Sequence, residues 1–164
     1  MNIKLDNYLV EKYPKIFINR YEEKTSMCGF EHNDGWFWLI DQLCSSIQSY
    51  IDINNEYNAN KISQVIATQI KEKFGGLDFS FSGGDDIIIG MTAMIQNMSY
   101  HVCEFCGTTE NIGTTKGWIH TICKECHNNA DRRTSSLMWE KNEDKKTEIC
   151  KELRKIKLDE LPLH

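Results

Sequence analysis

The chain has 164 residues, a formal net charge of −5 and 40% hydrophobic residues, the composition of an ordinary globular protein. This length accommodates one domain, or one domain with a small appended module, and excludes a polymerase, a kinase or a large barrel enzyme. Residues 1–100 carry 8 basic and 13 acidic side chains, whereas residues 101–164 carry 11 of each. Neither part is basic, which disfavours nonspecific nucleic-acid binding, since that usually depends on clustered positive charge.

Seven cysteines in a chain of this size indicate either a secreted disulfide framework or a metal site. The first residues, Met1 to Asp6, contain no apolar run typical of a signal peptide. No segment approaches the ~18–20 apolar residues that cross a membrane. We therefore expect no membrane association, and a cytoplasmic protein whose thiols are reduced.

The hydrophobic pattern predicts a helical layer at the start of the chain. Residues 5–13 fit a short helix that ends before Pro14, and residues 20–34 are polar and fit a loop. A longer helix follows with Asp34 as its N-cap, because its apolar residues recur at helical spacing. These residues are Trp36, Phe37, Leu39, Ile40, Leu43, Ile47, Tyr50 and Ile51. We expect this helix to pack in the core, with Cys44 as a small apolar residue on its buried face.

The next segment has two interpretations. Four apolar residues recur every four positions, which predicts a helix over residues 59–74 that stops at Gly75-Gly76. They are Ile62, Ile66, Ile70 and Phe74. A hairpin that turns at the two glycines is the alternative.

Alternating apolar and polar residues over 77–82 predict a half-buried strand. A turn at residues 83–86 leads into a helix over 87–99, with Asp85 or Asp86 as its N-cap. Beyond residue 134 the chain is rich in charge, and a narrow apolar stripe predicts a C-terminal helix. The stripe comprises Ile149, Cys150, Leu153 and Ile156.

Two pairs of cysteines form the most informative pattern. They are Cys103 and Cys106, then Cys123 and Cys126. The spacing C-x2-C-x16-C-x2-C is typical of a zinc site. A two-residue gap in a tight turn holds two sulfurs about one tetrahedral edge apart, and Gly107 suits the left-handed backbone of such a turn. Two such pairs complete a four-thiolate shell around Zn²⁺ with no position for water, which makes the site structural.

His127 directly follows the last of these cysteines and is the alternative fourth ligand. We favour Cys126, because it completes the symmetry of the two pairs. Cys28 has no partner at ligand spacing, and we expect the isolated His32 and His120 to be packed or surface residues. Because zinc-finger peptides gain roughly 10–16 kcal/mol on binding Zn²⁺, we expect residues 100–130 to be ordered only with metal.

The order of elements around the cysteines resembles a treble-clef zinc finger over about residues 101–133. A knuckle comes first, a hairpin turns between Gly113 and Trp118, and a helix opening near Cys123 carries the second pair. Treble clefs serve as nucleases, binding modules and structural supports, so the resemblance implies zinc but no particular activity.

The predicted organisation is therefore an α+β protein in three parts. Residues 1–100 form an α+β N-terminal domain, residues 101–133 the treble-clef-like zinc module, and residues 134–164 a charged C-terminal helix or tail.

Residues 123–128 also resemble the end of an HNH-type nuclease, in which His127 would be the final metal-binding histidine. That family places an Asp-His or His-His pair and then an Asn between its cysteine pairs. The sixteen residues here are about half the usual spacing and contain His120 but no such pair. Without a general base to activate water, phosphodiester hydrolysis loses its chemistry, so we expect no catalytic residue.

Over about residues 1–127 the chain resembles a family of small uncharacterised proteins of phages and prophage-bearing bacteria. The resemblance rests on segments that recur in this order. They are Asp34-Gly35-Trp36-Phe37, Ile40 to Cys44, Ala67 to Leu77, and Cys103-Glu104-x-Cys106-Gly107 with Gly117-Trp118 and Cys123. It implies a bacterial host cell and this architecture, and suggests an accessory protein for anti-defence or host takeover.

Two groups of charged residues are candidate interaction surfaces. The first, around the two glycines, comprises Lys71, Lys73 and Asp78; the second, around the zinc helix, comprises Lys116, Lys124, Arg132 and Arg133. The sequence thus predicts a non-enzymatic protein that binds a host or phage protein and contains structural Zn²⁺. A nucleic-acid or nucleotide-binding zinc finger is the alternative, and a degenerate HNH-like nuclease the second alternative.

Overall fold

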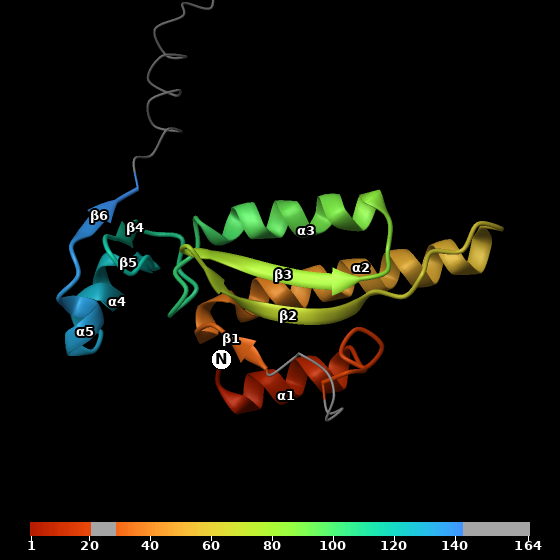
Figure 1. The fold of residues 1–164 in the computed structure, drawn as a ribbon, viewed down its shortest axis with the longest axis horizontal. Coiled ribbons are helices and arrows are strands. Elements are labelled where there is room, and N and C mark those ends of the chain that lie inside the picture. Colours follow the sequence, from red (N-terminus) through yellow and green to blue (C-terminus); the bar gives the residue numbers. More distant parts are fainter. Residues whose placement is uncertain (21–28, 143–164) are drawn as a thin grey trace, which may run out of the picture.

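A computed structural model of the chain describes residues 1–20 and 29–142. Five α-helices, one 3₁₀ helix and six strands form an α+β fold in these residues, as predicted (Figure 1). They are α1 (Ile3–Lys12), β1 (Phe30–Glu31), η1 (Asp34–Trp36), α2 (Phe37–Tyr57), β2 (Ile66–Lys73), β3 (Gly76–Ser82), α3 (Asp86–Ser99), β4 (Ile112–Thr115), β5 (Thr121–Cys123), α4 (Lys124–Asn129), α5 (Arg132–Ser135) and β6 (Trp139–Lys141).

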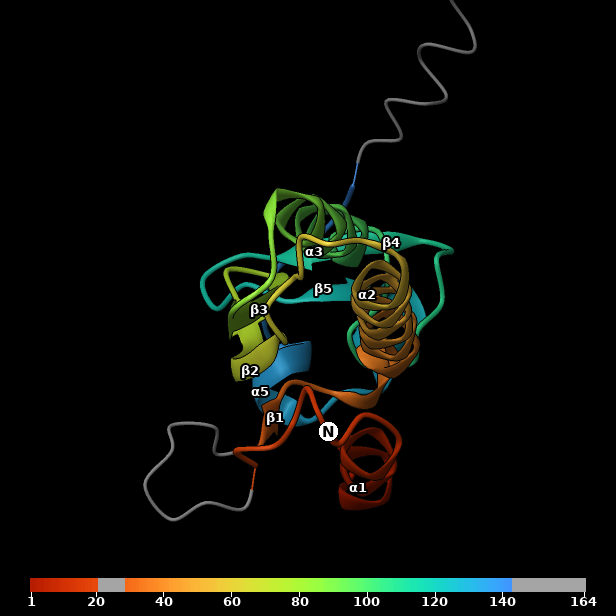
Figure 2. The ribbon, with the colours of Figure 1, turned by 90° about the vertical axis from the view of Figure 1, so that its right-hand side faces the viewer.

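The elements up to residue 102 form a layered unit that we call the body. Its sheet has the order β1-β2-β3, with β1 parallel to β2 and β3 antiparallel to it. Helices α1, α2 and α3 face this sheet from one side, so that apolar side chains of the helices and of the sheet meet in one core (Figure 2). Among the core residues, Trp36 is fully buried, and its indole N–H donates to the carbonyl of Val102 at 3.0 Å.

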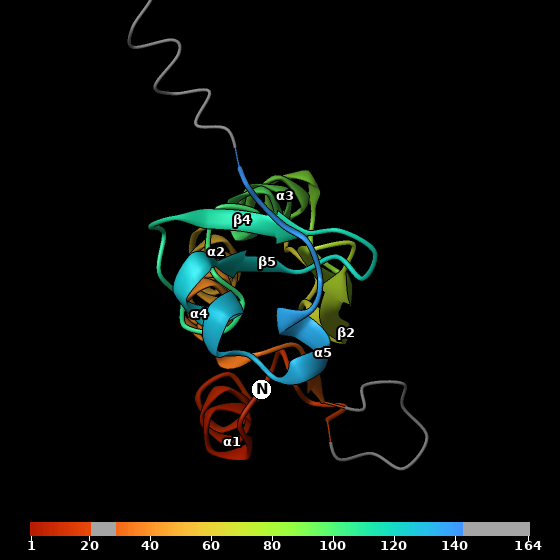
Figure 3. The same ribbon diagram turned by 90° about the vertical axis from the view of Figure 1, so that its left-hand side faces the viewer.

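The remaining described residues, 103–142, form a smaller unit that we call the cysteine module. Its sheet has the order β5-β4-β6, and helices α4 and α5 lie beside it (Figure 3). The predicted sequence of knuckle, hairpin and helix is present. Strand β6 pairs with β4 and brings residues 139–141, beyond the predicted boundary at 133, onto this sheet.

The predicted helix over residues 59–74 is wrong, and the alternative hairpin is what forms. Strand β2 pairs with β3, and the pairing register shifts between Ala67 and Gln69. This bulge inserts a residue, so Ala67 and Ile70 are buried three positions apart. Of the four residues that suggested a helix, Ile70 is buried, Ile62 and Ile66 are partly buried and Phe74 is exposed. Phe74 (φ 53°) and Gly75 (φ 82°) form the turn, and two positive φ values are typical of a type I′ hairpin turn.

The predicted cap of the long helix is also wrong. Asp34 lies inside η1, and α2 begins after Trp36 without a side-chain cap. The carboxylate of Asp34 instead accepts a hydrogen bond from the backbone N–H of Asn2 at 2.6 Å, which ties the chain start to η1. At α3 the prediction is confirmed, because Asp85 accepts from the N–H of Ile88 at 3.1 Å.

The loop predicted over residues 20–34 contains the short strand β1, which pairs with β2 through Phe30 and Ile70. Cys28 and the predicted C-terminal helix, with Ile149, Cys150, Leu153 and Ile156, lie outside the described residues. Within the described part of the chain, no helix is long and apolar enough to cross a membrane.

Candidate metal centre

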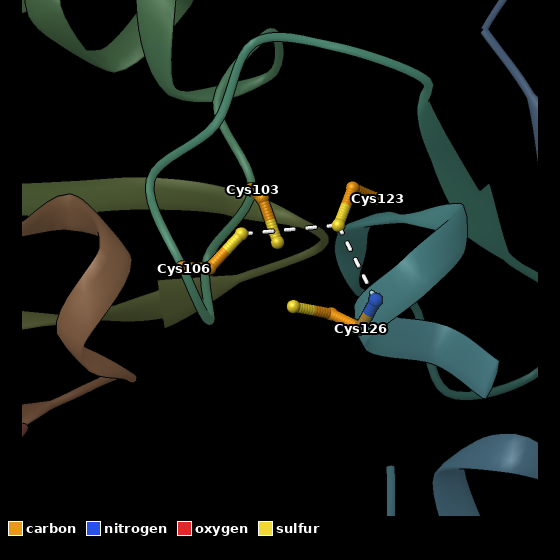
Figure 4. A group of neighbouring side chains, drawn as sticks. All are labelled: Cys103, Cys106, Cys123 and Cys126. Carbon is orange, nitrogen blue, oxygen red and sulfur yellow. Dashed lines mark hydrogen bonds between the residues drawn. The ribbon is translucent and has the colours of Figure 1, made fainter. Parts of the chain in front are cut away.

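The four predicted cysteines come together in the cysteine module. Their sulfur atoms all lie within 4.8 Å of one another (Figure 4). Cys103 and Cys106 come from the knuckle, Cys123 from the end of β5 and Cys126 from the first turn of α4. The group therefore brings together the knuckle and the start of α4, whose nearest cysteines are 17 positions apart in sequence. A metal ion bound here would link these two segments.

The spacing of the sulfurs fits a tetrahedral ion. A Zn–S bond of about 2.3 Å implies sulfurs about 3.8 Å apart along each tetrahedral edge. The sulfurs of Cys106 and Cys123, one from each pair, lie 3.8 Å apart. The thiols are thus placed to hold a metal ion with little rearrangement.

The backbone of the knuckle is shaped for this arrangement. Gly107 adopts the predicted left-handed conformation, with φ 79°, and its N–H donates to the carbonyl of Cys103 at 2.9 Å. At the second pair, the sulfur of Cys123 accepts the N–H of Cys126 at 3.3 Å and so caps α4. Such N–H donors stabilise negative charge on a thiolate.

The body closes over the knuckle at Gly35. A Cβ atom at this position would lie 2.1 Å from the carbonyl oxygen of Cys103 and 2.5 Å from the amide nitrogen of Gly107. The N–H of Gly35 also donates to the carbonyl of Glu104 at 2.8 Å. Only glycine allows η1 to approach the knuckle this closely, so the metal centre is built against the body.

The four thiols differ in environment. Cys103 and Cys123 are buried, Cys126 is partly buried and Cys106 is exposed. Burial raises the pKa of the Cys103 and Cys126 thiols. Burial also acts on Cys106, but hydrogen bonds from the Thr108 backbone and the neighbouring thiols outweigh it and lower its pKa. A bound cation would supply the charge that lets the remaining thiols ionise.

His127 is not part of the sulfur group. It is buried, its Nε2 lies 3.0 Å from the carbonyl oxygen of Leu137, and its ring packs beside Trp139. Its Nδ1 is buried and has no hydrogen-bond partner among the described residues. In this arrangement Cys126 supplies the fourth sulfur and His127 packs α4 against the segment that follows it.

A second polar cluster lies beside the metal centre and was not anticipated from the sequence. Glu104, inside the knuckle, is only 2% exposed. One of its oxygens accepts the backbone and side-chain N–H groups of Asn33 at 3.1 and 2.8 Å, and the other lies 3.1 Å from Nδ1 of His120. Burial acts to raise the Glu104 pKa, but the bonds from His120 and Asn33 outweigh it and lower that pKa.

His120 was expected to be an isolated packed or surface residue. The bond to Glu104 raises the pKa of His120, with burial acting in the opposite direction. The only sequence signal for this polar cluster was the acidic residue Glu104 between two of the cysteines. Its side chain turns toward the body, where it bonds Asn33.

The first predicted interaction group lies on the hairpin of the body. Lys71 and Asp78 are partners in the register of β2 and β3. Lys73 and Asp78 line a surface cleft of about 280 Å³ together with Phe74 and Tyr100. The structure therefore gathers this group around the hairpin turn.

The second predicted group is spread over the cysteine module. Lys116 forms an ion pair with Glu140. Lys124 lies 4.7 Å from the ring centre of Trp139, and the Arg133 guanidinium lies 5.6 Å from that of Trp118. Arg132 is exposed. Two of these basic groups stack on tryptophans, which holds them at defined positions on the surface.

Comparisons of the chain with known proteins found no matching family model, no matching curated protein and no matching solved structure.

Proposed function

We propose that the four cysteines hold one structural Zn²⁺, and that the chain is a non-enzymatic binding protein whose partner is a host or phage protein. Four thiol ligands favour Zn²⁺ among common divalent ions, because hard ions such as Mg²⁺ and Ca²⁺ prefer oxygen. A four-thiolate shell is full, so the ion has no place for a substrate or a water nucleophile. The ion would then fix the shape of a binding surface.

The observation that carries the binding role is that three exposed apolar side chains lie on the segments where the body meets the cysteine module. Phe74 is 75% exposed, Trp118 59% and Ile119 39%. Phe74 and Ile119 flank one contact, because the hairpin turn rests on the module at Gly75, and Trp118 precedes Ile119 in the chain. A Cβ atom at Gly75 would lie 2.7 Å from the side chain of Ile119, and the Thr121 hydroxyl donates to the Gly75 carbonyl at 2.6 Å. We call Phe74, Trp118 and Ile119 the junction surface.

The composition of the junction surface suits a protein partner. Exposed aromatic residues are enriched at the centres of protein interfaces, and charged residues commonly form their rims. Lys73 and Asp78 flank Phe74 in the same cleft and would supply such a rim. The metal centre would hold Trp118 and Ile119 in a fixed position relative to Phe74.

The backbone at Phe74 supports the same role. A bulky side chain at φ 53° is disfavoured by about 1–2 kcal/mol, and asparagine or glycine is the usual occupant of this turn position. Strained residues of this kind gather at functional sites, because the exposed side chain serves a purpose other than stability. Contact of Phe74 with a partner is such a purpose.

The resemblance to small phage proteins supports the remaining parts of the proposal. From it we propose the cytoplasm of a bacterial host, where a thiol-rich site would stay reduced and available for zinc. Proteins of that setting commonly redirect or inhibit host machinery, so a host-takeover or anti-defence role is the form of binding that we propose.

Site-specific photocrosslinking tests the binding role. A photoreactive phenylalanine analogue replaces Phe74 in the full zinc-loaded chain, produced in a bacterial host under phage infection. The matched control replaces Tyr57, which is 76% exposed at the far end of α2. We expect a discrete protein adduct from position 74 and none from position 57. Equal adducts from both positions, or none from either, would contradict the proposal.

Native mass spectrometry tests the metal. We expect a mass increment of one zinc ion per chain, retained in a variant with Cys44→Ala and lost when Cys103 and Cys123 are both changed to Ser. An increment of an iron–sulfur cluster, or no metal under anaerobic purification, would contradict the zinc assignment.

A further inference from the structure

A cleft of about 290 Å³ lies on the face of the cysteine module that carries the second polar cluster. Its lining includes Asn33, Phe105, Trp118, His120, Asp131 and Arg133. The cleft is distinct from the four-sulfur group, none of whose members lines it. Its volume is near the lower end of the range for small-molecule pockets, so it would take a ligand of modest size.

A buried carboxylate holds His120 at the wall of this cleft. Glu104 lies behind the imidazole, with one oxygen 3.1 Å from its Nδ1 and the other bound by Asn33. Phe105 packs edge-on against the same ring, at 5.7 Å between centroids. Nδ1 is committed to Glu104, which leaves Nε2 as the nitrogen that a ligand can use. A buried, fully bonded carboxylate that fixes one imidazole is a typical way to position a ligand-binding histidine.

Arg133 supplies a cationic group at the cleft. Its guanidinium lies 5.6 Å from the ring centre of Trp118, which orients it without using its N–H donors. Within residues 1–20 and 29–142, no carboxylate forms an ion pair with it at 4.0 Å or less. The planar fork of Arg133 thus remains free to bind an anionic group, a task for which guanidinium geometry is suited.

Asp131 limits the charge that the cleft can accept. Its carboxylate caps α5 by accepting the N–H of Thr134 at 2.8 Å, and it also lines the cleft. Together with the Glu104 carboxylate behind His120, it offsets much of the positive charge at the cleft. The cleft therefore suits a ligand with a single anionic group rather than a polyanion.

The exposed ring of Trp118 adds an apolar, planar surface beside His120 and Arg133. Such a ring stacks on flat heterocycles, and base–aromatic stacking contributes about 1–3 kcal/mol per base. We propose that this cleft binds a mononucleotide, with its phosphoryl group between His120 and Arg133 and its base against Trp118. This site goes beyond the proposed protein-binding role and does not depend on it.

Titration of the full zinc-loaded, ¹⁵N-labelled chain with adenosine monophosphate at constant ionic strength tests the proposal. We expect saturable shifts at the His120 imidazole and the Trp118 indole. Adenosine and inorganic phosphate, each lacking one half of the ligand, should bind at least about tenfold more weakly, since one lost charged hydrogen bond or one lost stack corresponds to about this factor.

Two neighbouring arginines provide a matched pair of variants. Arg133→Gln removes the cleft cation and should weaken mononucleotide binding about tenfold. Arg132→Gln changes the net charge equally but lies outside the cleft lining, and should change binding less than about twofold. Trp118→Leu should weaken binding of adenosine monophosphate while leaving that of inorganic phosphate unchanged.

Three outcomes would overturn the proposal. One is the absence of saturable shifts with any of the three probes. Another is an equal loss in the two arginine variants, which would show general electrostatic attraction. The third is tighter binding of a short acidic peptide than of adenosine monophosphate, which would make the cleft part of a protein interface. His120→Gln, checked by thermal unfolding, repeats the test on the other side of the cleft.

Discussion

The body and the cysteine module bury very different amounts of apolar side chain. In the body, 21 hydrophobic residues from its helices, strands and connecting segments form one buried cluster. In the cysteine module the corresponding cluster has four residues, of which Cys103 and Cys123 belong to the metal centre. Because burial of apolar area is the main favourable term in folding, the body carries its own stability and the module does not.

This difference assigns a separate source of stability to each region. A unit of about forty residues with so small a core commonly requires a metal or disulfides to fold. The four sulfurs sit where they join the knuckle to α4, so a bound ion would replace the missing core. Zinc-finger peptides gain roughly 10–16 kcal/mol in this way, which exceeds the net stability of many domains.

Removal of the metal is therefore expected to have the largest effect, and to affect one region only. Chelation should abolish the dispersed amide signals of residues 103–142 and leave those of the body in place, because the core of the body contains none of the four ligands. Two-dimensional ¹H–¹⁵N spectra before chelation, after it and after return of Zn²⁺ provide the measurement. Loss of dispersed signals from both regions at the same chelator concentration would show that the body also depends on the metal.

The converse change is a cavity in the body. Ile47 on α2 is fully buried, and Ile47→Ala should lower the free energy of unfolding of the body by about 2–5 kcal/mol. Ile53 on the same helix is 60% exposed, so Ile53→Ala should cost less than about 0.5 kcal/mol. Denaturant unfolding measures both, and zinc content by mass spectrometry should stay at one ion in each variant. Loss of zinc from Ile47→Ala would show that the module depends on the body core.

A third test concerns His32, which lies in the body next to the residue that bonds Glu104. Burial lowers the pKa of His32 to about 4, and its Nε2 is buried without a partner among the described residues. The unfolded chain, with an ordinary histidine pKa near 6.5, therefore takes up this proton more readily than the folded chain. Stability from this group is complete above about pH 6.5 and is lost as pH falls toward 4, by up to about 3 kcal/mol.

Comparison with His32→Gln isolates this contribution from the acid sensitivity of the metal centre. As pH falls from 7.5 to 4.5, the unfolding free energy of the parent should decrease more than that of the variant, since glutamine does not titrate. Parallel curves over that range would show that His32 does not report on folding of the body.

The cysteine spacing predicted the four-sulfur group because its geometry depends on local sequence. A two-residue gap in each pair largely determines how far apart its sulfurs lie, whatever the rest of the chain does. The amphipathic pattern of α2 was readable for the same reason, since helical periodicity is a local property. The bulge in β2 was not readable, because a one-residue shift in strand pairing depends on the partner strand β3. The repeat of Ile62, Ile66, Ile70 and Phe74 every four residues fitted a helix, although only Ile70 among them is buried.

The Glu104 cluster could not be predicted because its members are distant in sequence. Asn33, Glu104 and His120 meet only when η1 docks on the knuckle through Gly35, a contact between the two regions. Each of the three is unremarkable alone. The hairpin turn shows a similar limit, since Gly75-Gly76 suggested the turn but its centre includes Phe74, which has no intrinsic preference for positive φ.

The smallest expected effect on stability comes from a substitution at Phe74 in the hairpin turn. It should change the free energy of unfolding and partner binding in opposite directions. Phe74→Asn places a residue that favours type I′ turns at φ 53° and should raise the free energy of unfolding of the body by about 1 kcal/mol. The same change removes the most exposed member of the junction surface and should abolish capture of the partner found by crosslinking. Leu is the control, since Phe74→Leu keeps an apolar side chain and the strain. In Phe74→Asn, the free energy of unfolding, measured with denaturant, should therefore rise while partner binding is lost. In Phe74→Leu, both quantities should remain close to those of the parent. A stabilised Phe74→Asn variant that still binds the partner would show that Phe74 strains the turn but does not contact the partner. Binding would then be assigned to Trp118 and Ile119.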